Sequence, residues 1–207
     1  TVSNSLKILA LLTVLSLAPA IVIITTSFTR IIIVLSMLRH AFGMPSTPPN
    51  TVIIGLALLL TLFTMTPVID QIQEKSLQPY IDKQIDDTTA LNNASAPVRE
   101  FMISQTRDKD IALVLELANE DVPDSADDVS MTQLVTAFLL SELQTAFQIG
   151  FVIFLPFLAI DLIVASILMS MGMMMVPPMT ISLPIKILMF VLIEGWALVA
   201  QALVSSF

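Results

Sequence analysis

The chain has 207 residues, a mean hydropathy of +0.89 and only 13% charged residues, whereas a soluble domain averages roughly 25%. Its formal charge of −8 comes without a basic cluster, which excludes an electrostatic surface for nucleic acid. It has no cysteine and one histidine, His40, which excludes disulfides, thiolate chemistry and a multi-histidine metal site within one subunit.

The charge is concentrated in one part of the chain. Between Asp70 and Asp128 there are 14 acidic and 5 basic residues, while the remainder carries 3 acidic and 4 basic residues. This contrast predicts an all-α membrane protein with three regions. They are an N-terminal apolar helical hairpin (1–69), an acidic helical region (70–130) and a C-terminal apolar helical hairpin (131–207).

The first region contains two candidate membrane spans, residues 8–28 and 53–69, because a helix needs about 20 apolar residues to cross the hydrocarbon layer. Arg30, Arg39 and several turn residues up to Asn50 predict a short polar connection between them. The positive-inside rule places this connection in the cytoplasm. The acidic region then lies outside the cytoplasm.

Within the acidic region, apolar residues recur at helical spacing over 97–118, and Asp108 and Asp110 suit the N-terminus of a second helix there. About 60 residues bury little core alone, so we expect this region to pack against neighbouring subunits.

The third region begins with an apolar stretch, 134–175, that is too long for one crossing. We expect an amphipathic helix over about 131–148, a spanning helix over about 150–171 and a last span over 183–207. With the two earlier spans, this makes a four-span topology.

A methionine-rich turn separates the last two spans. Pro177 and Pro178 predict the end of the preceding helix. Met173, Met174 and Met175 follow Gly172, and three consecutive methionines cannot share one helix face. They are either apolar filler or an adaptable surface, since methionine is flexible and polarizable.

Five charged residues lie within or beside the apolar stretches: Arg30, Glu142, Asp161, Lys186 and Glu194. Such groups usually face a bundle interior or a water-filled cavity and pair with one another, although those near helix ends can reach the interface. We expect Lys186 to pair with Glu142, within or between subunits. A proton relay through Asp161 and Glu194 is the alternative use for these carboxylates.

The sequence carries no Gly-x-Ser-x-Gly elbow, no His-Glu-x-x-His helix and no phosphate-binding glycine loop. With one histidine and no cysteine, this predicts that the chain is not an enzyme and takes no cofactor.

Several motifs carry a resemblance to a known family. They are Thr29-Arg-Ile-Ile-Ile-Val34, Pro45-Ser-Thr-Pro-Pro-Asn50, Arg99-Glu-Phe-Met102, Thr145-Ala-Phe-Gln-Ile-Gly150 and Met171-Gly-Met-Met-Met-Val-Pro-Pro178. With these motifs the chain resembles the FliP family, which with its SctR relatives forms core subunits of the bacterial flagellar and type III secretion export gate.

The resemblance implies a channel subunit for unfolded flagellar proteins in the inner membrane, at the flagellar basal body. It implies a pentamer assembled with FliQ and FliR, associated with FlhB and FlhA, and helices arranged as a cone and largely buried against other subunits. It also implies a periplasmic acidic region and a signal peptide removed before Thr1.

By the same resemblance, Met173, Met174 and Met175 match a loop that closes the pore, and Gly172, Pro177 and Pro178 set its geometry. A ring assembly would give Glu142 and Lys186 a subunit interface at which to pair. The alternative function is a small-solute or ion transporter that uses Asp161 and Glu194.

Overall fold

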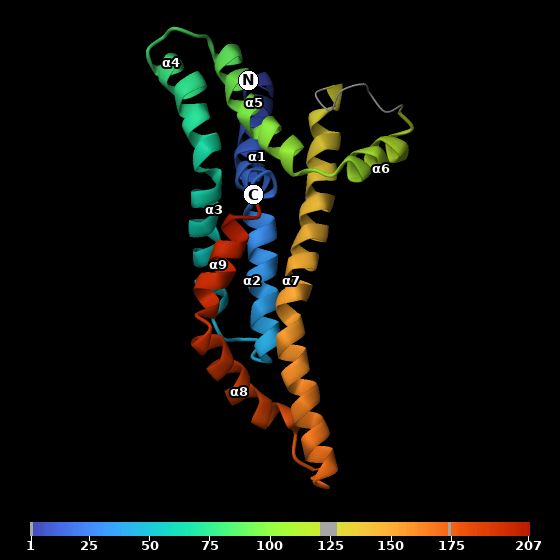
Figure 1. Cartoon of the computed structure of the whole chain (residues 1–207). Helices are drawn as coiled ribbons and strands as arrows, with labels where there is room; N and C mark the ends of the chain where they lie inside the picture. The colour runs from blue at the N-terminus through green and yellow to red at the C-terminus, as the bar shows by residue number, and fades with distance from the viewer. Residues whose placement is uncertain (1, 121–127, 174) are drawn as a thin grey trace. The chain divides into compact units, whose positions relative to one another are not determined.

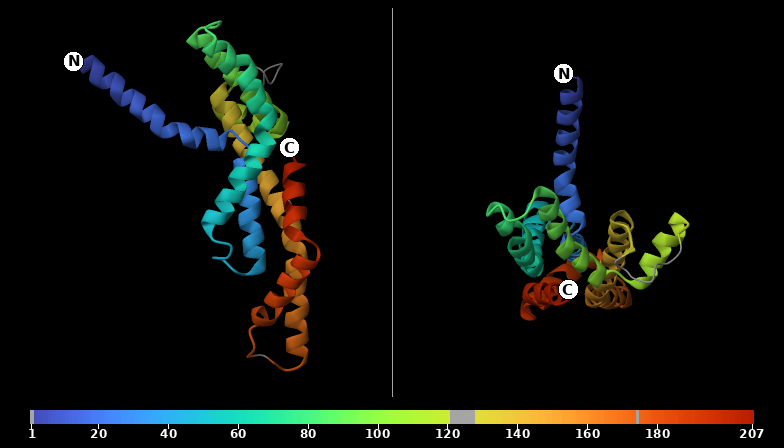
Figure 2. Two further views of the ribbon diagram at one scale, coloured as in Figure 1. Left: turned by 90° about the vertical axis from the view of Figure 1, so that its left-hand side faces the viewer. Right: turned by 90° about the horizontal axis from the view of Figure 1, so that it is seen from above.

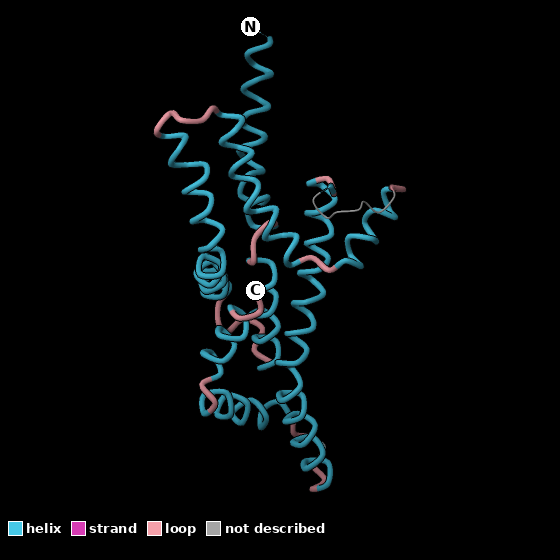
Figure 3. The backbone as a smooth tube through the Cα atoms, turned by 45° about the horizontal axis from the view of Figure 1, so that its top comes forward, coloured by secondary structure: helices cyan, strands magenta, loops and turns pink. Residues whose placement is uncertain are grey.

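The structure is a computed structural model that describes residues 2–120, 128–173 and 175–207. Every regular element among these residues is helical (Figures 1 and 3), which confirms the all-α membrane protein. The helices, in chain order, are α1 (Val2–Ile24), α2 (Phe28–Phe42), α3 (Asn50–Ile72), the π-helical turn η1 (Gln73–Leu77), α4 (Gln78–Ile81), α5 (Asp87–Gln105), α6 (Asp108–Ala118), α7 (Met131–Ser170), α8 (Pro178–Leu192) and α9 (Gly195–Val204).

The chain divides into two compact units, each built from two stretches of sequence. Unit 1 comprises Thr1–Thr29 and Met65–Glu142, and unit 2 comprises Arg30–Thr64 and Leu143–Phe207. Helices α3 and α7 contribute to both. The two units are defined by contacts within the structure, whereas the regions 1–69, 70–130 and 131–207 were predicted from composition. The division into these three regions therefore stays a prediction.

Unit 1 has its own apolar core, formed by α5, α6 and the first turns of α7. Met102 of α5, Leu115 of α6 and Phe138 of α7 are almost completely buried in it. Phe101 adds an edge-to-face contact with Phe138, with 5.9 Å between the ring centroids. The acidic residues therefore cover a packed core, and α7 completes this core from outside the 70–130 region.

Unit 2 is centred on the inner face of α2 and on an aromatic cluster. Ile31, Val34 and Leu38 recur at helical spacing and are fully buried. Phe42, at the end of α2, contacts the rings of Phe157 and Phe190 edge to face, at 5.0 and 4.9 Å between centroids. These contacts join α2, α7 and α8.

Three helix boundaries differ from the sequence-based expectation. Residues 28–42 form α2, whereas we expected a polar connection there. α7 runs without a break over 40 residues, so the predicted separation near residues 148–150 is wrong. Conversely, the stretch predicted as one span over 183–207 breaks at Ile193 and Glu194, and the two helices meet at 64° (Figure 2).

Among the described residues, two helical stretches are long and apolar enough to cross a membrane, Asn50–Ile81 and Met131–Ser170. The count rises to four if each of two bent pairs forms one span. These pairs are Ser16–Ile24 with Phe28–Phe42, and Pro178–Leu192 with Gly195–Val204.

Candidate functional site

The methionine-rich turn lies between the end of α7 and the start of α8. Gly172 has a left-handed φ of 74°. The Gly172 N–H donates to the Met169 carbonyl at 3.1 Å, and the Met173 N–H donates to the Leu168 carbonyl at 3.0 Å. This pair of bonds is the Schellman closure that ends many helices, and it favours glycine at the left-handed position. α7 therefore ends at a defined residue.

The far side of the turn is set by the two prolines. Pro177 is the N-cap of α8 with an extended backbone, and Pro178 is its first residue. Proline is well placed at the first helical position, because its missing N–H would have no intrahelical partner there and its φ already suits a helix. Thr180 closes the first turn by donating its N–H and its hydroxyl to the Pro177 carbonyl.

Between these two helix ends, the methionine side chains are exposed. Met175 is 97% exposed, and Met171 and Met173 are also exposed. Met174 lies outside the described residues. A Cβ built at Gly172 would meet no atom within 4 Å, so the backbone conformation and not crowding calls for glycine there. The turn thus presents flexible thioethers away from the packed helices of unit 2.

Lys186 of α8 is 2% exposed and is held by two groups from other helices. Its ammonium donates to Asp161 Oδ2 of α7 at 2.6 Å and to the Ala41 carbonyl of α2 at 3.0 Å. The contact joins α8 to both neighbours inside unit 2. A buried ammonium is tolerated when it is paired and hydrogen-bonded in this way.

The structure thus gives Lys186 the carboxylate of Asp161 as its partner within unit 2. Glu142 is fully buried in α7 and belongs to unit 1. The pairing of Lys186 with Glu142 stays a prediction. Asp161, which the alternative function needed for proton transfer, is engaged in an ion pair.

Arg30 of α2 is likewise 2% exposed, and its partners come from the last residues of the sequence. Its Nη1 donates to the Ser206 carbonyl at 2.7 Å and to the Ser206 hydroxyl at 3.2 Å. Its guanidinium lies 3.9 Å from the centroid of the Phe207 ring, a cation–π distance. Arg30 thereby holds the end of α9 against the start of α2.

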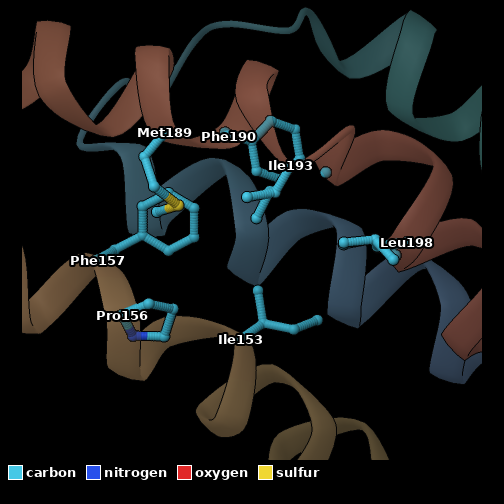
Figure 4. A pocket seen from close by; sticks show the side chains of 9 residues that line it. Ile153, Pro156, Phe157, Met189, Phe190, Ile193 and Leu198 are labelled. Carbon is cyan, nitrogen blue, oxygen red and sulfur yellow. The ribbon is translucent and has the colours of Figure 1, made fainter.

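Glu194, the last of the five charged residues, lies at the break between α8 and α9. It is exposed and has a left-handed φ of 52°. Beside the break, an apolar pocket of about 130 Å³ is lined by residues that include Pro156 and Phe157 of α7 and Met189 and Phe190 of α8. Figure 4 shows these side chains facing one space.

Sequence reasoning missed a polar network in unit 1. The Ser141 hydroxyl of α7 donates to Asp110 Oδ2 and accepts the backbone N–H of Arg107 at 3.1 Å. Arg107 also donates to Asp110 through Nε at 2.9 Å. The acidic first turn of α6 was visible in the sequence, but nothing there pointed to Ser141. Among the described residues, no three His, Asp or Glu side chains form a group that could hold a metal ion.

Comparison with known proteins decides the family. The model of the FliP family matches residues 11–203, nearly the whole chain. The chain belongs to the FliP family. The family member of Bacillus subtilis (strain 168), named flagellar biosynthetic protein FliP, is 53% identical over 206 residues, which cover 100% of this chain and 93% of that protein.

Two further members of the FliP family carry the same name. The protein of Pectobacterium carotovorum subsp. carotovorum is 51% identical over 98% of this chain and 79% of its own length. The protein of Caulobacter vibrioides is 50% identical over 97% of this chain and 76% of its own length. The matched stretches therefore span nearly the whole of this chain.

Proposed function

We propose that this chain is a core channel subunit of the flagellar type III export gate, and that it carries unfolded flagellar proteins across the inner membrane without acting as an enzyme. The observation that supports this most is the family match over residues 11–203, together with relatives named flagellar biosynthetic protein. The apolar helices support a place within the membrane.

Within this proposal, Met173, Met174 and Met175 form the deformable seal of the pore. The Schellman closure at Gly172 and the restart at Pro177 and Pro178 hold both ends of the turn, while the exposed thioethers between them stay adaptable. A ring of such side chains dewets a constriction and so stops ions, yet it deforms around a passing polypeptide.

The proposed assembly is a pentameric ring with FliQ and FliR, associated with FlhB and FlhA. Exposed apolar side chains along α7, such as Phe151, Leu162 and Ile163, support it because they need cover from protein or lipid. The proposed location is the inner membrane at the flagellar basal body. Arg39 faces the cytoplasm and the acidic region faces the periplasm, in keeping with the positive-inside rule.

In this ring, Lys186 also meets Glu142 of a neighbouring subunit, a contact that requires the helices to repack on assembly because both side chains are buried in the single chain. An ammonium group has three donors, and two of those of Lys186 are used by Asp161 and the Ala41 carbonyl. The third is available for a second carboxylate. The interface would then hold one cation between two acidic side chains.

The seal is tested by replacing Met173, Met174 and Met175 together with alanine and measuring ion conductance across the membrane during secretion. We expect conductance to rise, because alanine leaves the constriction wider and wetter. Met131→Ala serves as the control, since Met131 is an exposed methionine of unit 1. Unchanged conductance in the triple variant, or an equal rise in the control, contradicts the seal.

The assembly is tested by native mass spectrometry of the detergent-solubilised complex. We expect several copies of this chain together with small hydrophobic partner chains, and no solute uptake by the isolated chain in vesicles. Uptake coupled to proton movement would instead support the transporter.

A further inference from the structure

Glu194 occupies an unusual position in unit 2. It separates α8 from α9, its φ of 52° lies in the left-handed region, and its carbonyl accepts the N–H groups of Ala197 and Leu198 at 2.9 and 3.2 Å. Residues with a Cβ rarely adopt this conformation, because the Cβ approaches the following carbonyl oxygen. The surrounding packing must therefore impose it.

The packing that imposes it comes from Phe190 and its neighbours. Gly195 is buried, and a Cβ at this position would lie 2.2 Å from the Phe190 ring. Phe190 in turn meets Trp196 edge to face, with 5.4 Å between the ring centroids. Phe190 thus packs against the backbone at Gly195, and the Glu194 side chain beside it is exposed.

An open pocket of about 310 Å³ lies at this point. It is lined by Glu194 and Trp196 together with Phe190, Val191, Gly195 and Ala197. It is distinct from the pocket of Figure 4, although both share Phe190 and Gly195. Trp196, the only tryptophan of the chain, is 44% exposed. The pocket therefore combines one carboxylate with an accessible indole and otherwise apolar walls.

The cationic side chains described in unit 2 bind groups other than Glu194. Arg30 bonds to Ser206, Arg39 donates to Asn50 Oδ1 and to the Pro48 carbonyl, and Lys186 is paired with Asp161. Within the described part of the chain, the Glu194 carboxylate has no hydrogen bond or ion pair. It lies, however, inside a bent pair of helices that is apolar enough to form one membrane span. A carboxylate in such surroundings is costly unless a cation neutralises it.

From this charge balance we infer that Glu194 and Trp196 form a docking site for a lysine or arginine side chain of another membrane polypeptide, different from this chain. The cation binds the Glu194 carboxylate and lies against the Trp196 indole, which is the aromatic side chain best suited to a cation. The alkyl stem packs on Phe190 and Val191, as the stems of long cationic side chains do on apolar surfaces. Unit 2 of a second copy offers no such cation, because its described cations are engaged.

The test places the photo-cross-linking amino acid p-benzoylphenylalanine at Ala197, an exposed residue of the pocket wall, in the full chain within native membranes. We expect one dominant cross-link to a different polypeptide, at a peptide that contains a lysine or arginine. Glu194→Lys should reduce the yield at least about ten-fold, because like charges are then opposed. Glu194→Gln should reduce it less, since only the attraction is lost.

Reversal of the partner's cation to glutamate should restore the cross-link in Glu194→Lys. The control is Glu116→Lys, which makes the same charge change at an exposed glutamate of α6 and should leave the yield unchanged. Chain abundance in the membrane is compared among all variants. A cross-linked peptide without a cation, a cross-link only to lipid or to a second copy, or an unchanged yield in Glu194→Gln overturns the proposal. None of these cross-linking measurements requires the chain to export protein.

Discussion

Helix ends are determined differently in the acidic segment of unit 1 and in the apolar helices of unit 2. α5 begins where the Asp86 side chain accepts the Thr89 N–H, and α6 ends at Asn119, a residue that tolerates its left-handed conformation. In unit 2, α8 breaks at Ile193 and Glu194, with no proline at the break, while α7 continues through Pro156. Caps govern the helix ends of the polar segment, whereas the break between α8 and α9 depends on the packing of Phe190 against Gly195 and Trp196.

The largest loss of stability is expected when the ion pair that holds α8 is removed. Lys186→Ala leaves Asp161 without its cation, and loss of one partner of a buried pair costs about 3–5 kcal/mol. The Asp161 side chain is 34% exposed, so we expect the low end, about 3 kcal/mol. Chemical unfolding in detergent measures the change in the free energy of unfolding.

Two variants accompany this measurement. Lys109→Ala removes an exposed cation of α6 and should change stability little. Lys186→Met combined with Asp161→Leu removes both charges and should recover most of the loss, because apolar residues can replace a buried pair at little cost. A double variant as unstable as Lys186→Ala would show that the charge imbalance is not the cause.

A smaller effect is expected from the glycine beside the break. Gly195→Ala brings a Cβ to 2.2 Å from the Phe190 ring and should cost about 1–3 kcal/mol, as overpacking does. Gly55→Ala is the matched control in α3, where a Cβ meets no atom within 4 Å. It should instead stabilise the helix by about 0.5–1 kcal/mol. Equal effects of the two variants in thermal unfolding would mean that packing does not set the break.

The smallest effect concerns the local cap of α5. Hydrogen bonds from Thr88 and then Thr89 lower the pKa of Asp86 from 3.8 to about 2. A lowered pKa means that the cap stabilises the helix above pH 3.8 and that this contribution is lost as the pH falls toward 2. Asp86→Asn keeps a capping oxygen but does not titrate. The protection factor of the Thr89 amide, which compares its exchange rate with the intrinsic rate at the same pH, should therefore fall on acidification in the original chain and not in this variant.

Much of the fold was predictable from the sequence, but the contacts that shape unit 2 were not. Length and apolarity indicated the helices, and Asp108 and Asp110 marked the start of α6. The same signals failed for α7, because Glu142, Pro156 and Asp161 indicated a division of the apolar stretch and the spanning helix was predicted to begin near Gly150. In the structure a Cβ at Gly150 would lie 2.3 Å from Met37 of α2. Glycine there allows close helix approach, which a one-dimensional pattern does not distinguish from a break.

In the candidate site, too, local features were predictable from the sequence, whereas contacts between helices were not. The turn at Gly172, Pro177 and Pro178 was visible because its signals are local. The partner of Lys186 was not, since Glu142, Asp161 and Glu194 are equivalent as carboxylates and periodicity does not rank them. The choice of Asp161 depends on how α8 packs against α7 and α2.

The contact between Arg30 and Ser206 has a consequence for the order of events during synthesis. Its two residues are 176 positions apart, so at roughly 5–20 residues per second a ribosome makes the second about 10–35 s after the first. Helix α2 is therefore complete long before the contact can form. The final packing of its first turn must therefore wait until Ser206 has been made.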